Sequence, residues 1–352
     1  MDLHTYAQNL PKVELHIHLE GAILPTTLLK LAERNHISLP TRDQDRIEEM
    51  YQFRDFGQFL DTYRLITSCL RTVDDYTLIS YEFGRERARQ NIRYSEVTFT
   101  ILTNMVVTGL SWQAILEALN QGRRQAQREF GVDWRWIFDI VRNFPETQDQ
   151  VTTIALAARD LAPESGVIAL GLGGSETEFP PELFTQSFDR AHQSGLACIP
   201  HAGETAGPDS ILASIQKLHA MRIGHGVRCI EDPNLVEYLH RLQIPLEVCP
   251  TSNVRLGIYP DYQSHPLRKL WDAGLYITVN SDDPPMFGTS LNREYEILVD
   301  QFGFTADDLD QISLNALHAS LLSKPEKIGM EQEFKDQFSR MRTTIWEEGS
   351  VR

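Results

Sequence analysis

Short apolar runs alternate with longer amphipathic segments along most of the chain. Eight of these runs have the length and the β-branched or aromatic content that is typical of buried strands. They span residues 13–17, 94–100, 134–141, 167–172, 197–200, 222–224, 245–248 and 275–279. Between them, apolar residues recur at spacings of three and four, which predicts helices. A strand and a helix repeated eight times predict an α/β fold of the parallel (β/α)8 class, the TIM barrel.

Residues at the expected helix ends support this alternation. Ser111 stands before the run WQAILEALNQGRRQAQREF, where its hydroxyl can cap the first turn, and Gly131 follows the run. Proline opens three later helices, at Pro208, Pro233 and Pro266, where its missing N–H costs no helical hydrogen bond. We therefore expect helices between the later strands as well.

Residues 25–91 are too many for one crossover helix between the first two strands, so they predict a helical insertion. Within it, the run FRDFGQFLDTYRLI places Phe53, Phe56, Phe59 and Leu60 at helical spacing. Two interpretations remain open. Either the segment forms an apolar lid over the mouth of the barrel, or it is an amphipathic helix that packs on the flank of the barrel.

The chain continues well beyond the eighth predicted strand. Thr305 and Asp308 form the pattern of a capping box, and residues 305–352 therefore predict extra C-terminal helices. No repeat, low-complexity tract or linker rich in proline and glycine interrupts the sequence. We expect one elaborated domain over residues 1–352.

Composition and charge narrow the functional classes. The 352 residues are 41% hydrophobic and 23% charged, as in ordinary globular proteins, and they are enough for a large core. The formal net charge of −16 and the lack of a Lys/Arg cluster disfavour a nucleic-acid partner. The first residues lack the pattern of a signal peptide, and no apolar run reaches the roughly 18 residues of a membrane span. We expect a soluble, cytoplasmic protein with no membrane partner.

Four cysteines are scattered along the chain, at positions 69, 198, 229 and 249. No two of them form a C-x-x-C pair, so the sequence favours neither a disulfide framework nor a thiolate zinc site. We expect buried free thiols.

The clearest chemical signal is the stretch PKVELHIHLEG near the start of the chain. Side chains at positions i and i+2 of a strand point to the same face, so His16 and His18 would project together, at the spacing of a metal site. Later predicted strands end in His201, His225 and Asp282. In barrels of this class, chemistry gathers at the carboxyl ends of the strands. Each residue alone has an ordinary structural explanation, but together they predict an active site.

Three histidines and one carboxylate suit a zinc ion, and suit iron or manganese less well. We expect the ligands to be His16, His18, His201 and Asp282. Such a metal lowers the pKa of bound water towards roughly 7, which generates hydroxide at neutral pH.

The remaining acidic and basic residues near these strand ends then need roles. His225 is a candidate to orient the attacking water and take its proton, and Glu204 is a candidate to donate a proton to the substrate. Asp283 is expected to accept a hydrogen bond from the substrate. Gly173 and Gly174 leave bare backbone at the mouth, where an N–H can approach a planar ring closely.

The motifs HIHLEG, HAGE, RIGHGV, CPTSN and NSDDP, in this order, resemble the adenosine deaminase family of the amidohydrolase superfamily. The resemblance extends from residue 11 to about residue 295. It implies an enzyme that replaces the 6-amino group of an adenine ring with oxygen and releases ammonia. Dinuclear relatives often bridge two metals with a modified lysine after strand four, where this chain reads LGLGG, so one zinc is expected. The H-x-E and P-C-x-x-C signature of the cytidine deaminase fold is absent from the sequence.

The resemblance also implies catalytic roles. Zinc-bound hydroxide would add to C6 of the ring while Glu204 protonates N1, and Asp282 would be both a ligand and a catalytic residue. His225 would position and deprotonate the water. Asp283 would accept a hydrogen bond from N7, and the backbone of Gly174 would reach N3. Substrate contacts are thus expected from His18, Glu20, Gly174 and Asp283.

The sequence departs from the adenosine-specific pattern where the sugar of the substrate would lie. Glu20 stands where that pattern usually has Asp, and Ser175 stands where it has Asp in a Gly-Asp-Glu run. These changes put ribose recognition in doubt and leave the ring chemistry unaffected. Adenosine or 2′-deoxyadenosine is the first expectation, with adenine, an N6-substituted adenine or 6-amino-6-deoxyfutalosine as alternatives. Ser252, in CPTSN, either touches the substrate mouth or is a turn serine.

Two other functional classes stay open at this point. A metallohydrolase of the same superfamily that opens an amide, lactone or phosphoester would need a different proton donor from Glu204 and usually a second metal. A binding protein that keeps the barrel without the chemistry is also conceivable on any fold. The presence of every expected ligand, acid and base disfavours this second alternative.

Overall fold

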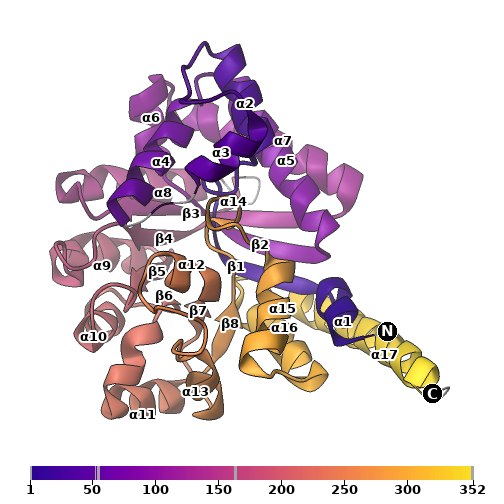
Figure 1. The fold of residues 1–352 in the computed structure, drawn as a ribbon. Helices are drawn as coiled ribbons and strands as arrows, with labels where there is room; N and C mark the ends of the chain where they lie inside the picture. Colours follow the sequence, from indigo (N-terminus) through magenta and orange to yellow (C-terminus); the bar gives the residue numbers. More distant parts are fainter. Residues whose placement is uncertain (1, 52, 54–55, 162–164, 350–352) are drawn as a thin grey trace.

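A computed structural model describes residues 2–51, 53, 56–161 and 165–349. Over these residues, eight parallel strands pair in chain order into a nearly closed barrel with helices around it (Figure 1). The strands are β1 (Lys12–His18), β2 (Ile92–Phe99), β3 (Asp133–Val141), β4 (Val167–Gly173), β5 (Ala197–Ala202), β6 (Ile223–His225), β7 (Leu246–Val248) and β8 (Ile277–Val279). A parallel bridge between Ile17 and Asp282 joins the last strand to the first. The predicted TIM barrel is confirmed.

Helices fill the connections between the strands and extend both ends of the barrel. They are α1 (Leu3–Asn9), α2 (Pro25–Arg34), α3 (Gln44–Met50), α4 (Phe56–Ser68), α5 (Val73–Arg89), α6 (Ile101–Thr108), α7 (Trp112–Phe130), α8 (Gln148–Arg159), α9 (Thr185–Gln193), α10 (Pro208–Lys217), α11 (Pro233–Leu242), α12 (Pro250–Arg255), α13 (Leu267–Asp272), α14 (Pro284–Phe287), α15 (Leu291–Phe302), α16 (Ala306–Ala319) and α17 (Lys324–Gly349). Short 3-10 helices are η1 (Pro145–Thr147), η2 (Pro181–Phe184) and η3 (Val227–Glu231).

The predicted helix signals act as expected. The Ser111 hydroxyl accepts a hydrogen bond from the Ala114 amide at the start of α7, and Gly131 ends the helix with a φ of +70°. Pro208 and Pro233 are the first residues of α10 and α11. The third proline differs by one position, because α13 begins at Leu267 and Pro266 precedes it.

The insertion between β1 and β2 contains α2 to α5, and α4 lies at the mouth of the barrel. Phe59 and Leu60 of α4 line the cavity there, and the Phe59 ring stacks on Phe287 with 5.4 Å between the ring centroids. Residues 54–55 of the predicted run lie outside the described residues, and so does the side chain of Phe56. The position of α4 favours the lid interpretation over the flank, whereas movement of the segment stays a prediction.

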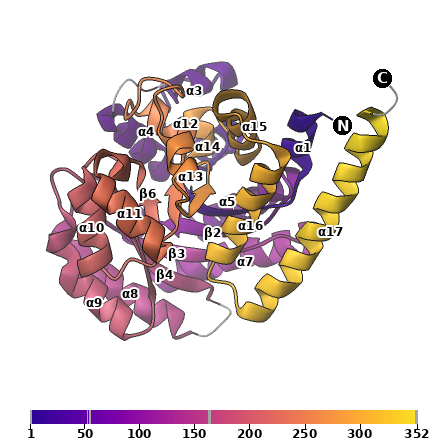
Figure 2. The same cartoon turned by 90° about the horizontal axis from the view of Figure 1, so that it is seen from below.

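The C-terminal helices pack on the outside of the barrel. The capping box of Thr305 and Asp308 forms at the start of α16, as predicted. The next helix, α17, packs against α16 and extends past the barrel beside α1 (Figure 2). Its Arg342 donates to the Tyr6 hydroxyl over 3.4 Å and to the Asp310 carboxylate over 2.6 Å. These contacts join the two ends of the chain.

The interior of the barrel contains buried charges below the mouth. Arg222, the residue just before β6, donates to Glu96 of β2 over 2.5 Å and to Glu247 of β7 over 2.6 Å. A third N–H of this guanidinium donates to the Ala319 carbonyl over 2.9 Å. We call Arg222, Glu96 and Glu247 the arginine cluster. It ties three strands together from the inside.

All four cysteines are free and buried, as predicted. Among the described residues, no helix combines the length and the apolar character that crossing a bilayer requires.

Candidate active site

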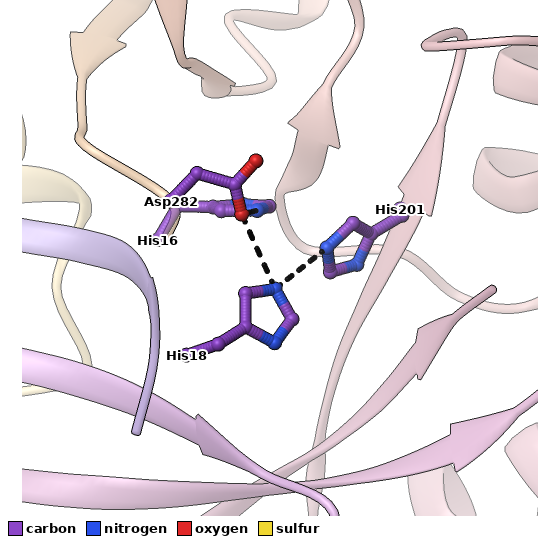
Figure 3. A group of neighbouring side chains, drawn as sticks. All are labelled: His16, His18, His201 and Asp282. Atoms are coloured by element: carbon purple, nitrogen blue, oxygen red, sulfur yellow. Dashed lines mark hydrogen bonds and ion pairs between the residues drawn. The ribbon is translucent and has the colours of Figure 1, made fainter. Parts of the chain in front are cut away.

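Four side chains from three strand ends converge at the mouth of the barrel (Figure 3). His16 and His18 come from β1, His201 comes from β5, and Asp282 lies just after β8. Their ligand atoms all lie within 4.8 Å of one another. The Asp282 Oδ1 atom is 3.5 Å from His16 Nε2 and 3.4 Å from His18 Nε2, and His18 Nε2 is 3.2 Å from His201 Nε2. The structure thus brings together the four residues that the sequence predicted as ligands.

The donor atoms of this cluster fit a metal ion. His16 Nε2 is buried and has no hydrogen-bond partner among the described residues. Two imidazole nitrogens that face each other at 3.2 Å, His18 Nε2 and His201 Nε2, both present lone pairs to a shared cation when each neutral ring carries its proton on Nδ1. Three nitrogens and one carboxylate oxygen are a donor set that suits zinc. A second group of possible donors, His225, Cys249 and Asp282, shares its carboxylate with the first.

His16 is oriented by the arginine cluster behind it. Its Nδ1 lies 3.0 Å from the Glu247 carboxylate, which leaves Nε2 free to face the other ligands. Burial raises the pKa of Glu247, but Arg222 and His16 together hold it below its usual value. The charge on Glu247 therefore persists in the interior and fixes the ring.

Asp282 has an unusual backbone conformation and a buried hydrogen-bond partner. Its backbone has a φ of +63°, a conformation that side chains other than glycine rarely adopt and that is common at functional sites. The Ser252 hydroxyl donates to Asp282 Oδ2 over 2.7 Å. Ser252 is 1% exposed and is not among the cavity-lining residues of the described chain. It supports a ligand, a role that neither of the two sequence interpretations anticipated.

Glu204 projects into the cavity from the loop after β5 and is 8% exposed. Burial, with the nearby carboxylates of Asp282 and Glu176, raises the pKa of Glu204 to about 8. At neutral pH it is therefore mostly protonated and able to donate. Glu176 holds this loop, because it accepts the backbone N–H groups of residues 203–206 and the hydroxyl of Ser210.

His225, at the end of β6, is 1% exposed and also reaches the cavity. Its Nε2 lies 3.6 Å from Glu204 Oε1 and 3.9 Å from Asp282 Oδ2. Its Nδ1 lies 3.2 Å from the Asn253 side-chain nitrogen on the opposite side of the ring. The imidazole thus stands between the expected acid and the expected ligand, with a buried amide behind it.

Asp283 and Gly174 lie on the same cavity. Burial is the main cause that raises the pKa of Asp283 well above its usual value, and the charge of the adjacent Asp282 is the second. Gly21 explains part of this burial, since a side-chain carbon at that position would lie 1.6 Å from Asp283 Oδ1. Gly174 has a φ of +101°, and a side-chain carbon there would come within 2.5 Å of Asn143. Both glycines are required by close approach.

The cavity has a volume of about 960 Å3, which includes the part open to solvent. It is lined by His18, Phe59, Leu60, Tyr63, Arg64, Thr67, Thr100, Thr103, Asp139, Val141, Asn143, Phe144, Gly173, Gly174, His201, Glu204, His225, Leu256, Asp282 and Asp283. Arg64 is the only lysine or arginine among these described residues.

Glu20 is absent from this lining. It is fully buried and accepts hydrogen bonds from the Thr100 amide over 3.1 Å and from the Asn104 side chain over 2.7 Å. Asp139, at the end of β3, lines the cavity instead, and its Oδ1 has no hydrogen-bond partner among the described residues. Burial raises the pKa of Asp139 to about 6. The structure therefore places Asp139 where the sequence had suggested Glu20.

No sequence pattern was used to predict the partners that lie behind the reactive groups, among them Glu176, Glu247 and Asn253. Glu247 did carry a signal, because a charged residue inside the short apolar run of β7 has to face either the barrel interior or its helices. Asp139 carried the same signal within β3. The other two lie in loops or short helices, where no periodicity indicates the direction of a side chain.

The chain is similar to known proteins in both sequence and structure. A family profile described as adenosine deaminase matches residues 11–337. A Streptomyces avermitilis protein named aminodeoxyfutalosine deaminase is 38% identical over 93% of this chain and 90% of its own length. A Chlorobium phaeobacteroides protein named adenine deaminase is 35% identical over 92% of this chain and 96% of its own. An amidohydrolase from Burkholderia ambifaria, solved with bound zinc, has a TM-score of 0.89 at 28% identity and covers 97% of this chain and 94% of that one.

Proposed function

This chain belongs to the adenosine deaminase family and is an enzyme that deaminates adenine-type substrates, and from this premise we propose that its substrate is 6-amino-6-deoxyfutalosine. Adenosine, the first expectation from the sequence, is the substrate named for neither of the two relatives described above. The proposal therefore moves to one of the alternatives that the departures at Glu20 and Ser175 had left open.

The shape and charge of the cavity carry this proposal. The compound is an adenine nucleoside whose sugar bears an aryl group that ends in a carboxylate. Apolar residues in the cavity lining, with Phe144 and Leu256 among them, suit the aryl group. Arg64 on α4 offers the cation that a carboxylate requires, and its own ion pair with Asp61 is exposed and 3.4 Å long. A free adenine base would leave both features unused.

Adenine is the second candidate, because the Chlorobium relative is named for it at nearly the same identity. The two candidates differ in what lies beyond the ring. Only the larger substrate would contact α4 and Arg64. The effect of mutating Arg64 on activity therefore distinguishes aminodeoxyfutalosine from adenine.

We further propose one zinc ion, held by His16, His18, His201 and Asp282. When bound, zinc would lower the pKa of a water molecule towards about 7 and so supply the nucleophile. The bound zinc of the Burkholderia ambifaria structure supports this choice of metal.

The chain itself would then orient and protonate the ring. Glu204, protonated at neutral pH, would donate its proton to N1 as C6 is attacked. The Gly174 backbone, uncovered by any side chain, would approach N3. A neutral purine has a lone pair and no proton at N7, so Asp283 in its protonated form would donate there. This direction is opposite to the one that we expected from the sequence.

Ammonia release tests the substrate directly. Aminodeoxyfutalosine, adenosine, 2′-deoxyadenosine, adenine and N6-methyladenine are compared on one preparation, and its zinc content is measured. We expect the highest kcat/KM for aminodeoxyfutalosine. Arg64→Met should raise its KM about fivefold, since a partly exposed ion pair contributes ~1 kcal/mol, and should affect adenosine less.

Arg42→Met is the matched control, because Arg42 is exposed and does not line the cavity. A higher kcat/KM for adenine, with no effect of Arg64→Met, would establish the second candidate and refute the first.

A further inference from the structure

A row of three hydrogen bonds runs from a backbone amide to the catalytic imidazole. The Leu267 N–H donates to His265 Nδ1 over 3.1 Å. His265 Nε2 lies 3.1 Å from the Asn253 side-chain oxygen, and the Asn253 side-chain nitrogen lies 3.2 Å from His225 Nδ1. None of the four residues is more than 4% exposed. The row is therefore shielded from water along its whole length.

The first bond determines the direction of the others. A backbone N–H can only donate, so His265 Nδ1 must present a lone pair. A neutral His265 then carries its proton on Nε2 and donates to the Asn253 oxygen. The amide nitrogen of Asn253 consequently faces His225 and donates to Nδ1. His225 Nδ1 accepts, so the proton of a neutral His225 lies on Nε2.

The surroundings of His265 keep the row in this arrangement. Burial lowers the pKa of His265 to about 3, so the ring is neutral at physiological pH. Tyr259 and Phe302 pack edge-on against it, with ring centroids 5.0 and 5.7 Å away. A flipped ring would also leave the Leu267 N–H facing a carbon atom. The origin of the row is thus fixed by packing and by the backbone.

We propose that His265 and Asn253 are positioning residues that hold His225 in the tautomer with its proton on Nε2. In this form His225 donates a hydrogen bond into the cavity, towards the space between Glu204 Oε1 and Asp282 Oδ2. It would hold the attacking water through one of the water's lone pairs. From the sequence we expected His225 to take the proton of that water. In this tautomer it would not do so.

The catalytic consequence rests on the proposed deaminase function, whereas the tautomer itself does not. A donor at this position orients the lone pair of the nucleophile and leaves proton acceptance to the Asp282 carboxylate, which lies 3.9 Å from His225 Nε2. Loss of the row would therefore lower kcat while the substrate and metal contacts, which come from other residues, persist.

The tautomer is measurable without substrate. Protein labelled with 15N-histidine is examined by long-range 1H–15N NMR in the metal-free and zinc-bound forms, and His225 is assigned by its loss in His225→Gln. We expect the ring proton on Nε2 in both forms. A proton on Nδ1 in the wild-type protein would overturn the proposal.

Two variants test the positioning role. Asn253→Asp replaces the donor by an acceptor and should move the His225 proton to Nδ1, with kcat about 10²–10⁴-fold lower and with KM and zinc content nearly unchanged. His265→Gln keeps a donor towards Asn253 and should retain more activity than His265→Phe, which keeps the packing alone. His219→Gln, on the surface, is the control for histidine loss.

The outcomes separate the two proposals. An unchanged His225 tautomer in Asn253→Asp, or an unchanged kcat after the tautomer moves, would refute the positioning role. The expected tautomer in a wild-type enzyme that leaves aminodeoxyfutalosine intact would refute only the substrate.

Discussion

Two regions of the barrel interior bury charged and polar groups in opposite ways. In the arginine cluster, the guanidinium of Arg222 uses its three nitrogens on Glu96, Glu247 and the Ala319 carbonyl. At the mouth, His16 Nε2, Asp139 Oδ1 and Asp283 Oδ1 are equally buried but have no hydrogen-bond partner among the described residues. We call these three the mouth groups. The two regions are separated by a single imidazole, since His16 contacts Glu247 on one side and Asp282 on the other.

This difference distinguishes buried polar groups that stabilise the fold from buried polar groups that are placed to bind a ligand. A buried polar atom without a partner costs about 1–3 kcal/mol, so folded proteins keep few of them. The mouth groups are tolerable when a metal ion and a polar substrate supply the missing partners. The arginine cluster requires no such ligand. Mutations in the two regions should therefore affect different measurements.

Asp282→Ala should have the largest effect, because it removes a proposed metal ligand. We expect zinc content to fall from one per chain towards zero, and ammonia release to disappear with it. In the metal-free protein the carboxylate keeps the Ser252 hydroxyl and the His16 imidazole as partners, so the unfolding free energy should fall by about 1–3 kcal/mol. Elemental analysis and denaturant titration of the same sample check both statements. Full zinc retention would mean that the ligand set is wrong.

Glu204→Gln comes next and removes the proposed proton donor without altering the shape of the side chain. Turnover should fall about 10²–10⁴-fold, the usual contribution of a general acid. Zinc content should be unchanged, because Glu204 is not a proposed ligand. Steady-state kinetics and metal analysis provide the two readouts. Near-normal kcat in this variant would exclude the role.

Arg222→Met disrupts the arginine cluster and leaves two carboxylates buried without a cation. The unfolding free energy should fall by about 3–5 kcal/mol, the cost of removing one partner from a buried ion pair. Arg89→Met, which breaks an exposed pair with Glu86, should lower it by no more than about 0.5 kcal/mol. Urea denaturation compares the two variants. Equal losses would contradict the structural role of the arginine cluster.

Ser252→Ala should have the smallest effect of the four. It deletes the hydroxyl that donates to Asp282 Oδ2 over 2.7 Å and leaves the ligand in place. We expect the dissociation constant of zinc to rise about 10–100-fold, as for other residues that support a metal ligand. Competition with a zinc chelator measures this change. Ser264→Ala, at an exposed position, is the control and should leave zinc affinity unchanged.

Much of the fold and of the candidate site follows from local patterns. The strand of His16 and His18 places two imidazoles on one face whatever surrounds it, because side chains alternate along any strand. The carboxyl ends of parallel strands meet at one end of a barrel, so His201, Glu204 and Asp282 were expected together before any contact was known. These conclusions require only strand periodicity and topology.

The tertiary structure alone decided which groups face the ligand and which support them. Glu20 turns away to Thr100 and Asn104, and Asp139 takes its place on the cavity. Ser252 and Asn253 stand side by side in the chain but serve Asp282 and His225 respectively. The sequence by itself determined the barrel and the grouping of His16, His18, His201 and Asp282 at its mouth, because both follow from spacing along the chain. The direction of each supporting bond depends on packing between residues far apart in sequence, and no local pattern contains that information.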